Sequence, residues 1–271
     1  MTRSVGRSDA VPHHGMADPV TSEEQLDGGN ASGAVVRVGD TVRKPWTTTT
    51  PRVVEFLEAL RAAGLDVPAP LSRDDQGRLV LEHIPGTMAI DQTPLGCDVI
   101  RRVGALIRRI HDASAALTVP DDWPVLLPAP TPDLVCHNDL ATWNLVIDGD
   151  RLVFIDWDGA GPSSRLWDLA YAAISFAHLF PDAPAEESAS RLVAFLDGYG
   201  AWEELRRALP EVLADRAQAM YDHLERSHRQ AVEPWASMFT DFHGPWWLDT
   251  TRHIREHESL WRCVERGEMG C

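Results

Sequence analysis

Three polar side chains in the middle of the chain have the spacing of a phosphoryl-transfer site. The loop at residues 137–144, here called the catalytic loop, reads H-x-D-x-x-x-x-N. A short apolar segment follows it and ends in Asp156. An Asp on such a loop can orient an acceptor hydroxyl and take its proton, while amide and carboxylate oxygens suit Mg²⁺. We therefore expect Asp139 to be the catalytic base, and Asn144 and Asp156 to be metal ligands.

Two predicted strands explain the distance in sequence between the last two residues. Residues 145–147 and 152–155 are apolar, and residues 148–150 read Asp-Gly-Asp, which favours a tight turn. A hairpin of this kind brings Asp156 back beside Asn144, so that both side chains can reach one metal ion. A lone Asp or Asn is usually a turn former, but the motif together with its context predicts a functional site.

A glycine-rich segment and a lysine upstream predict a phosphate-binding region. Residues 28–35 approach the form G-x-G-x-x-G-x-V, with Gly28, Asn30 and Gly33 in the glycine positions. Asn tolerates unusual backbone angles, so this loop can still turn over phosphates, although a plain glycine-rich turn is the alternative. Lys44 ends the second predicted strand, where a cation could pair with nucleotide phosphates.

The helix expected over residues 52–63 has an apolar stripe formed by Val53, Phe56, Leu57 and Leu60, and Gly64 ends it. This helix also offers a carboxylate partner for Lys44. Glu55 and Glu58 lie one turn apart on it, and either could form the ion pair that aims the lysine. We prefer Glu55 and expect the other glutamate to be a solvated helix-face charge.

Two further residues are expected to support the catalytic loop. The ring nitrogens of His137 should brace the loop rather than bind a metal. Asp168 lies early in an apolar helix, where its carboxylate either accepts hydrogen bonds from the backbone of the catalytic loop or favours the helix start.

The chain divides into segments of different character around these residues. Residues 1–21 are polar and are expected to be a disordered tail. Residues 22–87 predict short strands and one helix, and Pro85-Gly86 marks a joint. Residues 88–271 are mainly helical, with an apolar stripe at helical spacing that begins at Val99, and further helices are expected near residues 165–179, 186–199, 202–229 and 245–266. The fold class is therefore α+β, with a small β-rich lobe and a mainly helical lobe.

Composition excludes several classes of protein. The net charge of −16 argues against nucleic-acid binding. It favours a cationic substrate if the acidic residues line a cleft, and the alternative is a solvated acidic surface. No apolar run approaches the roughly 18 residues that a membrane helix needs. The polar N-terminus lacks a signal-peptide core, so a cytoplasmic protein is expected. Four scattered cysteines form no C-x-x-C pair, which predicts neither a disulfide framework nor a zinc site.

The chain resembles the aminoglycoside phosphotransferase family, the antibiotic-kinase-like branch of the protein-kinase fold. The catalytic loop, residues 155–158 and residues 165–170 carry the resemblance. It implies a bilobal protein-kinase-like fold and an ATP- and Mg²⁺-dependent transfer of the γ-phosphate to a hydroxyl of a small molecule, such as an aminoglycoside-like compound. It also implies that Lys44 contacts ATP phosphates and that the segment from Glu82 to Ile84 is the hinge that meets adenine through backbone groups.

Two rival functions are retained at this point. The imperfect glycine loop allows a nucleotide-binding pseudokinase with a regulatory role. A protein kinase is less favoured, because no A-P-E segment follows Asp156. The acceptor is expected against the helical lobe, where four tryptophans either stack on a cation or sugar or fill the core. These are Trp235, Trp246, Trp247 and Trp261, and Asp158 and Asp241 are candidate acidic contacts for an amine.

Overall fold

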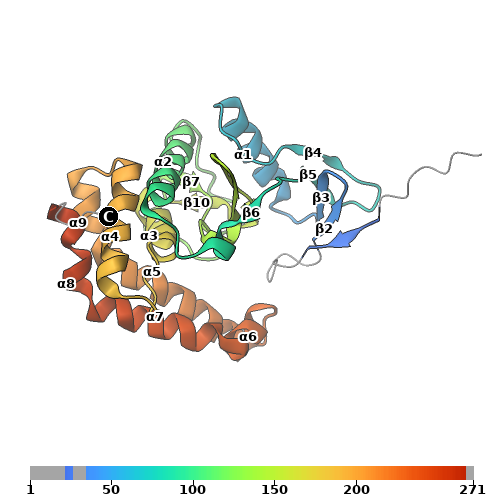
Figure 1. The fold of residues 1–271 in the computed structure, drawn as a ribbon. Coiled ribbons are helices and arrows are strands. Elements are labelled where there is room, and N and C mark those ends of the chain that lie inside the picture. The colour runs from blue at the N-terminus through green and yellow to red at the C-terminus, as the bar shows by residue number, and fades with distance from the viewer. Residues whose placement is uncertain (1–21, 27–34, 267–271) are drawn as a thin grey trace, which may run out of the picture.

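The computed structural model describes residues 22–26 and 35–266, which form a small β-rich part and a larger, mainly helical part (Figure 1). This arrangement confirms the predicted α+β fold class. The predicted tail at residues 1–21 lies outside the described residues. The same holds for the glycine-rich segment with Gly28, Asn30 and Gly33, so these predictions stay untested.

The first part is an antiparallel sheet with strand order β1-β2-β3-β5-β4. The strands are β1 (Glu24–Gln25), β2 (Val36–Val38), β3 (Thr41–Lys44), β4 (Pro70–Arg73) and β5 (Leu79–Glu82). Val38 pairs with Thr41 across a turn in which Gly39 has a φ of 60°, a value that glycine adopts without strain. This hairpin places Lys44 at the buried end of β3, and Lys44 ends a strand as predicted.

Helix α1 (Thr50–Ala62) lies beside this sheet and begins with a proline in its first turn. The predicted apolar stripe is confirmed, because Val53, Phe56, Leu57 and Leu60 are all buried. Gly64 follows the helix with a φ of 79° and its N–H donates to the carbonyl of Arg61, which ends the helix as expected.

Two small sheets hold the catalytic loop in the second part. Strand β7 (Leu134–Cys136) pairs with β10 (Gly161–Ser163), and β8 (Leu145–Asp148) lies between β6 (Thr87–Met88) and β9 (Arg151–Phe154). The predicted β8–β9 hairpin is confirmed by the pairing of Leu145 with Phe154. The expected lobe boundary at residue 87 falls within β6, which pairs with β8 of the second part.

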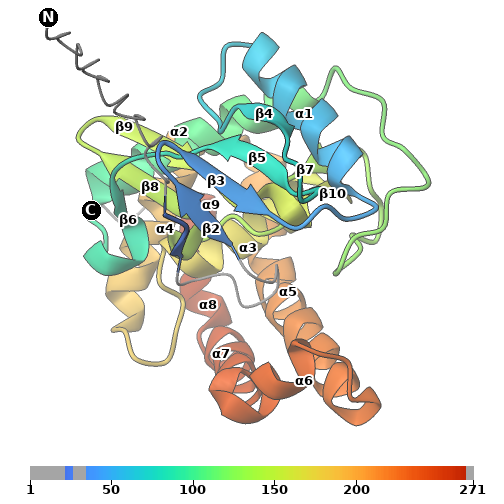
Figure 2. The same cartoon turned by 90° about the vertical axis from the view of Figure 1, so that its right-hand side faces the viewer.

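Helices make up most of the second part. The long ones are α2 (Cys97–Ser114), α3 (Arg165–Phe176), α4 (Ala185–Tyr199), α5 (Glu203–Gln230) and α7 (Gly244–Glu256). The short ones are α6 (Trp235–Met238), α8 (Glu258–Trp261) and α9 (Cys263–Arg266). Figure 2 shows α5, α6 and α7 extending away from the rest of the molecule.

One helix expectation is wrong. Residues 245–266 do not form a single helix, because the backbone leaves the helical region at His257, where φ is −108° and ψ is 19°. The apolar pattern continues across this break, since Ile254, Trp261 and Val264 are all buried. A periodic pattern alone therefore does not reveal where the helix ends.

Helices α2 and α4 cross at close range behind the catalytic loop. A Cβ added at Gly104 of α2 would collide with the carbonyl oxygen of Phe195, and one at Gly198 of α4 would collide with that of Arg101. Two glycines thus allow two backbones to touch.

No helix in the described ranges has the length and apolar character needed to cross a bilayer. Cys97, at the start of α2, is disulfide-bonded, although the spacing of the cysteines predicted no disulfide framework.

Candidate active site

Asp139 is held on the catalytic loop by two side chains. The Nδ2 atom of Asn144 donates to the Asp139 carbonyl at 2.9 Å and to its Oδ2 at 2.8 Å. The hydroxyl of Tyr171 on α3 also hydrogen-bonds the Asp139 carboxylate. Burial raises the pKa of Asp139, and the nearby charge of Asp156 acts in the same direction, while the bonds from Tyr171 and Asn144 oppose it. The carboxylate is therefore oriented, and it binds a proton more readily than a solvated Asp.

His137 braces the loop, as predicted. Its Nε2 lies 3.0 Å from the carbonyl oxygen of Ile155, and its Nδ1 accepts the N–H of Asp139 at 3.3 Å. The backbone N–H can only donate and the carbonyl can only accept, so the neutral ring with hydrogen on Nε2 satisfies both. The imidazole also packs against Trp157 and Phe154 at centroid distances of 4.4 and 5.8 Å.

Asp168 accepts a hydrogen bond from the catalytic loop, the first of its two predicted roles. Its Oδ1 lies 2.8 Å from the backbone nitrogen of Asn138, a residue with a φ of 66°. Such a positive φ is unusual outside glycine and requires support from the surroundings. The carboxylate supplies that support, since it holds the N–H of the strained residue directly before Asp139.

The predicted metal ligands lie at the open end of the β8–β9 hairpin, with Asn144 just before its first strand and Asp156 just after its second. The backbone N–H of Ile155 donates to the Asn144 carbonyl at 2.9 Å, so Asp156 follows directly beside Asn144. Asp156 has a φ of 58° and a side chain that is 26% exposed. Because Nδ2 of Asn144 donates to Asp139, the amide oxygen of Asn144 is the atom that remains available to a cation. One carboxylate and one amide oxygen are a donor set that fits Mg²⁺.

Lys44 reaches this hairpin from the first sheet. Its Nζ lies 2.5 Å from Oδ1 of Asp156 and 2.7 Å from Oδ2 of Asp158. Burial on its own lowers the pKa of Lys44, but the two carboxylates outweigh this effect, so that its pKa is raised. The lysine thus joins the small sheet to the catalytic half of the molecule as a charged ammonium.

The expected pair between Lys44 and Glu55 is not formed, which corrects that prediction. The Glu55 side chain is 70% exposed, and its carboxylate lies 3.8 Å from Arg52 of its own helix. Glu58 is exposed as well. The reason is geometric: α1 turns its apolar face toward the core and its glutamates toward solvent, while Asp158 takes the position of partner to Lys44.

The predicted hinge begins at the last residue of β5, Glu82. The backbone N–H of Glu82 donates to Ala69 at 2.9 Å, and that of His83 donates to Asp40 at 3.0 Å. Ile84 is buried and packs with Val146 and Val153. The segment thus connects the two parts of the molecule, and the adenine contact assigned to Glu82 and Ile84 stays a prediction.

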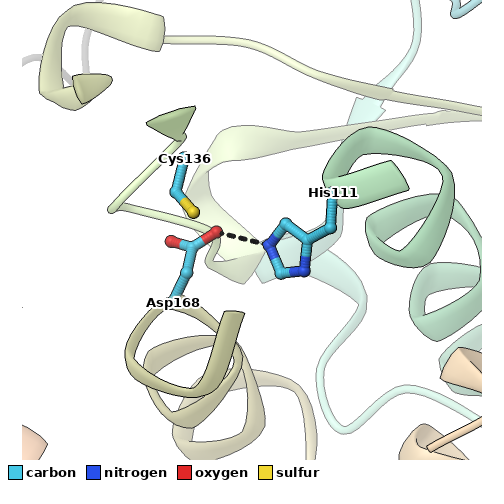
Figure 3. Close-up of side chains that lie close together, drawn as sticks. All are labelled: His111, Cys136 and Asp168. Atoms are coloured by element: carbon cyan, nitrogen blue, oxygen red, sulfur yellow. Dashed lines mark hydrogen bonds and ion pairs between the residues drawn. The ribbon is translucent and has the colours of Figure 1, made fainter. Parts of the chain in front are cut away.

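A buried trio behind the loop has the residue types of a metal site. The ligand atoms of His111, Cys136 and Asp168 lie within 4.8 Å of one another, and Figure 3 shows them converging from separate elements. His111 Nε2 lies 3.0 Å from Asp168 Oδ2, and its Nδ1 lies 2.9 Å from the Tyr199 hydroxyl. Asp168 uses its other oxygen on Asn138.

The contacts within this trio indicate a brace for the loop. Burial, followed by the nearby charge of Asp168, raises the pKa of the Cys136 thiol well above its usual range, so this thiol keeps its proton at neutral pH. The ring and the carboxylate are already matched as donor and acceptor, so the trio supports the loop through Asn138.

The four candidate tryptophans differ in burial. Trp261 and Trp247 are buried, and Trp247 stacks on Tyr171 with a centroid distance of 5.9 Å. Trp235 and Trp246 are partly buried. Core packing therefore accounts for Trp261 and Trp247. Trp247 also packs against Tyr171, the residue whose hydroxyl bonds Asp139.

Sequence reasoning missed three residues next to the catalytic loop. Tyr171 lies one turn after Asp168 on α3, and this i, i+3 spacing could have indicated it. His111 and Arg216 occur on helices far away in sequence, where a single His or Arg usually indicates a solvated face. Nothing in the local pattern distinguishes them.

The chain has a kinase-like fold, in which a small sheet lies next to a mainly helical lobe. A model of the phosphotransferase enzyme family matches residues 115–209, which include Asp139, Asn144 and Asp156. The trifolitoxin immunity protein of Rhizobium leguminosarum bv. trifolii is 29% identical over 228 residues, covering 77% of this chain and 85% of that protein.

Solved structures match over most of the chain. A choline/ethanolamine kinase family protein from Mesorhizobium loti superposes with a TM-score of 0.64 at 17% identity, covering 93% of this chain and 94% of the other. Amicoumacin kinase hAmiN, in complex with AMP-PNP, Ca²⁺ and Ami, has a TM-score of 0.62 at 16% identity and covers 89% of both chains. The family match and these structures confirm the predicted resemblance and the kinase-like fold.

Proposed function

We propose that the protein is a small-molecule kinase, which transfers the γ-phosphate of ATP to a hydroxyl group of its acceptor. The observation that carries this proposal is the convergence of Lys44, Asp139, Asn144 and Asp156 from three elements. Lys44 and Asp156 are 2.5 Å apart, and Asn144 contacts Asp139 at 2.8 Å. An ammonium, a base and two oxygen ligands are the groups that phosphoryl transfer requires.

Asp139 would act on the acceptor. Its carboxylate, held by Asn144 and Tyr171, accepts a hydrogen bond from the acceptor hydroxyl and aims the oxygen at the γ-phosphorus. A bond forms between that oxygen and phosphorus, and the bond from phosphorus to the bridging oxygen breaks with its electron pair leaving on ADP. The hydroxyl proton passes to Asp139.

Lys44 and the two ligand residues would act on the donor. When the nucleotide binds, the ammonium of Lys44 would leave Asp156 for the phosphates and would keep Asp158 as the carboxylate that orients it. Asn144 and Asp156 would hold Mg²⁺, which neutralises phosphate charge when bound. The hinge from Glu82 to Ile84 and the glycine loop with Gly28, Asn30 and Gly33 remain the proposed nucleotide contacts.

The acceptor class follows from charge and from the names of similar proteins. The chain has a net charge of −16, which favours cationic compounds over anionic ones. The similar structures are described as a choline/ethanolamine kinase family protein and an amicoumacin kinase. We propose an acceptor that carries both a hydroxyl and an amino group, in the range from small amino alcohols to aminoglycoside-like compounds.

The pseudokinase alternative is not favoured. A chain that binds nucleotide without turnover has no need of an oriented base, yet Asp139 is present and held by two side chains.

A phosphorylation screen tests the proposal. Purified protein with Mg²⁺ and ATP is offered amino alcohols, choline, aminoglycosides, macrolides, homoserine and sugars, and ADP release and acceptor mass are measured. We expect transfer to at least one amine-bearing acceptor, and we expect Asp139→Asn to lower kcat by about 100-fold or more, the range for removal of a general base. ATP binding without transfer to any acceptor would instead support the pseudokinase.

A further inference from the structure

A buried arginine lies directly behind the catalytic loop. Arg216, in the middle of α5, is 1% exposed. Its Nη2 donates to the backbone carbonyl of Asn138 at 3.2 Å, and Asn138 immediately precedes Asp139. A side chain from a distant helix thus holds the residue that positions the proposed base.

The same guanidinium lies over two aromatic rings of α3. Its central carbon is 4.2 Å from the ring centroid of Tyr171 and 5.4 Å from that of Trp167. Tyr171 is the residue whose hydroxyl bonds the Asp139 carboxylate. Arg216 therefore contacts both supports of Asp139: the backbone on one side and the tyrosine on the other.

This burial costs free energy. Nε and Nη1 of Arg216 find no hydrogen-bond partner within the described chain. A buried charge with unpaired donors is unfavourable for stability, and an apolar side chain of similar size would often serve a core better. Sequences break such rules mainly at functional sites.

We propose that Arg216 is a positioning residue, which anchors the catalytic loop to α5 through the carbonyl of Asn138 and the ring of Tyr171. With Asp168 holding the N–H of Asn138 and Arg216 holding its carbonyl, the left-handed backbone before Asp139 is clamped from two helices. The inference rests on the proposed function, because it takes Asp139 as the base.

Three variants test the anchor. Arg216→Met removes charge and hydrogen bond but keeps an unbranched apolar stem, and Arg216→Lys keeps the charge without the planar fork. The matched control is Arg207→Met on the same helix, where the arginine is 56% exposed and pairs with Glu203 at 2.6 Å.

Two measurements are made on each variant. Amide hydrogen exchange follows residues 137–144 against the strands of the first sheet, and steady-state kinetics give kcat and KM for ATP. For Arg216→Met we expect exchange of the catalytic loop to rise about tenfold with the sheet unchanged. We also expect kcat to fall about tenfold or more with KM for ATP within about twofold. Arg216→Lys should shift both in the same direction by a smaller factor, and Arg207→Met should change neither.

The outcomes separate this inference from the proposed function. Wild-type exchange of the catalytic loop in Arg216→Met overturns the anchor, whatever the activity. A kcat loss that only matches the loss of folded protein also overturns it, because it shows a purely structural arginine. If Arg216→Met does not fold, Arg216→Lys decides, and wild-type loop exchange and kcat in that variant overturn the anchor. If the wild-type protein transfers no phosphate, the proposed function fails, and the exchange measurement still decides whether the loop is held.

Discussion

Lys44 faces two carboxylates from the same short segment, and neither comes from α1. Asp156 is the proposed metal ligand, and Asp158 follows it by two positions at 2.7 Å from the ammonium. At the residue scale, Asp158 therefore takes the part that Glu55 was expected to play. Asp158 and Glu55 can be distinguished by experiment, because Asp158 contacts the lysine and Glu55 is exposed to solvent.

Asp158→Asn should weaken nucleotide use, while Glu55→Gln should not. The Asp158 side chain is 41% exposed, so solvent screens the pair. We expect KM for ATP to rise by up to about fivefold, which corresponds to about 1 kcal/mol, the upper range for exposed pairs. Glu55→Gln should leave KM within about twofold of the wild type. A larger effect from Glu55 than from Asp158 in steady-state kinetics would restore the original prediction.

Cys136 should be chemically inert in the folded protein. Its raised pKa keeps the thiol protonated, and the thiolate is the nucleophile. Iodoacetamide at mildly alkaline pH should leave Cys136 unmodified until denaturant is added, as followed by peptide mass spectrometry. Rapid alkylation under native conditions, or protection that appears only when zinc is supplied, would contradict the proposed brace with His111 and Asp168.

At the scale of elements, the crossing of α2 and α4 depends on the absence of two side chains. An alanine normally stabilises a helix interior relative to glycine by about 1 kcal/mol. At Gly198 the added methyl group would meet the carbonyl of Arg101, and at Gly104 that of Phe195. The contact therefore outweighs helix propensity at these positions.

Gly198→Ala should destabilise the fold in spite of its better helix propensity. We expect a loss of about 1–3 kcal/mol in the free energy of unfolding, the range for overpacked cores. The control is Gly96→Ala at the N-cap of α2, where no neighbour lies within 4 Å of the added carbon. It should cost at most about 1 kcal/mol. Urea titration measures both, and a stabilised Gly198→Ala protein would show that the helices can move apart.

At the scale of the whole molecule, the net charge of −16 acts on both substrates with opposite sign. Salt screens this field over roughly 10 Å or less at moderate ionic strength. An amine-bearing acceptor is attracted to the protein and anionic ATP is repelled. Screening should therefore weaken the binding of the first and assist that of the second.

Raising the salt concentration should move the two KM values apart. Between about 0.02 and 0.2 M salt, KM of an amine-bearing acceptor should rise about twofold to threefold while KM of ATP falls or stays constant. A neutral hydroxyl acceptor is the control and should show little change. Equal changes in KM for cationic and neutral acceptors would mean that the acidic residues lie away from the acceptor site.

The sequence by itself predicted the reaction class that we propose and most of the elements near the site. Asp139 and Asn144 are five residues apart on one loop, and a single hairpin places Asp156 beside them. Local geometry of this kind follows from turn residues and apolar runs, which is why β8 and β9 were both predicted. The helix stripe of α1 was predicted for the same reason.

Only the tertiary structure decided how these residues are supported. Lys44 meets Asp156 across 112 positions of sequence, and Arg216 meets Asn138 across 78. Such contacts depend on how whole elements pack, and the residues involved have no local pattern that marks them. The same packing turned Glu55 toward solvent and brought Asp158 to Lys44. Spacing along the chain can therefore predict a loop and its chemistry, but not the distant side chains that hold it.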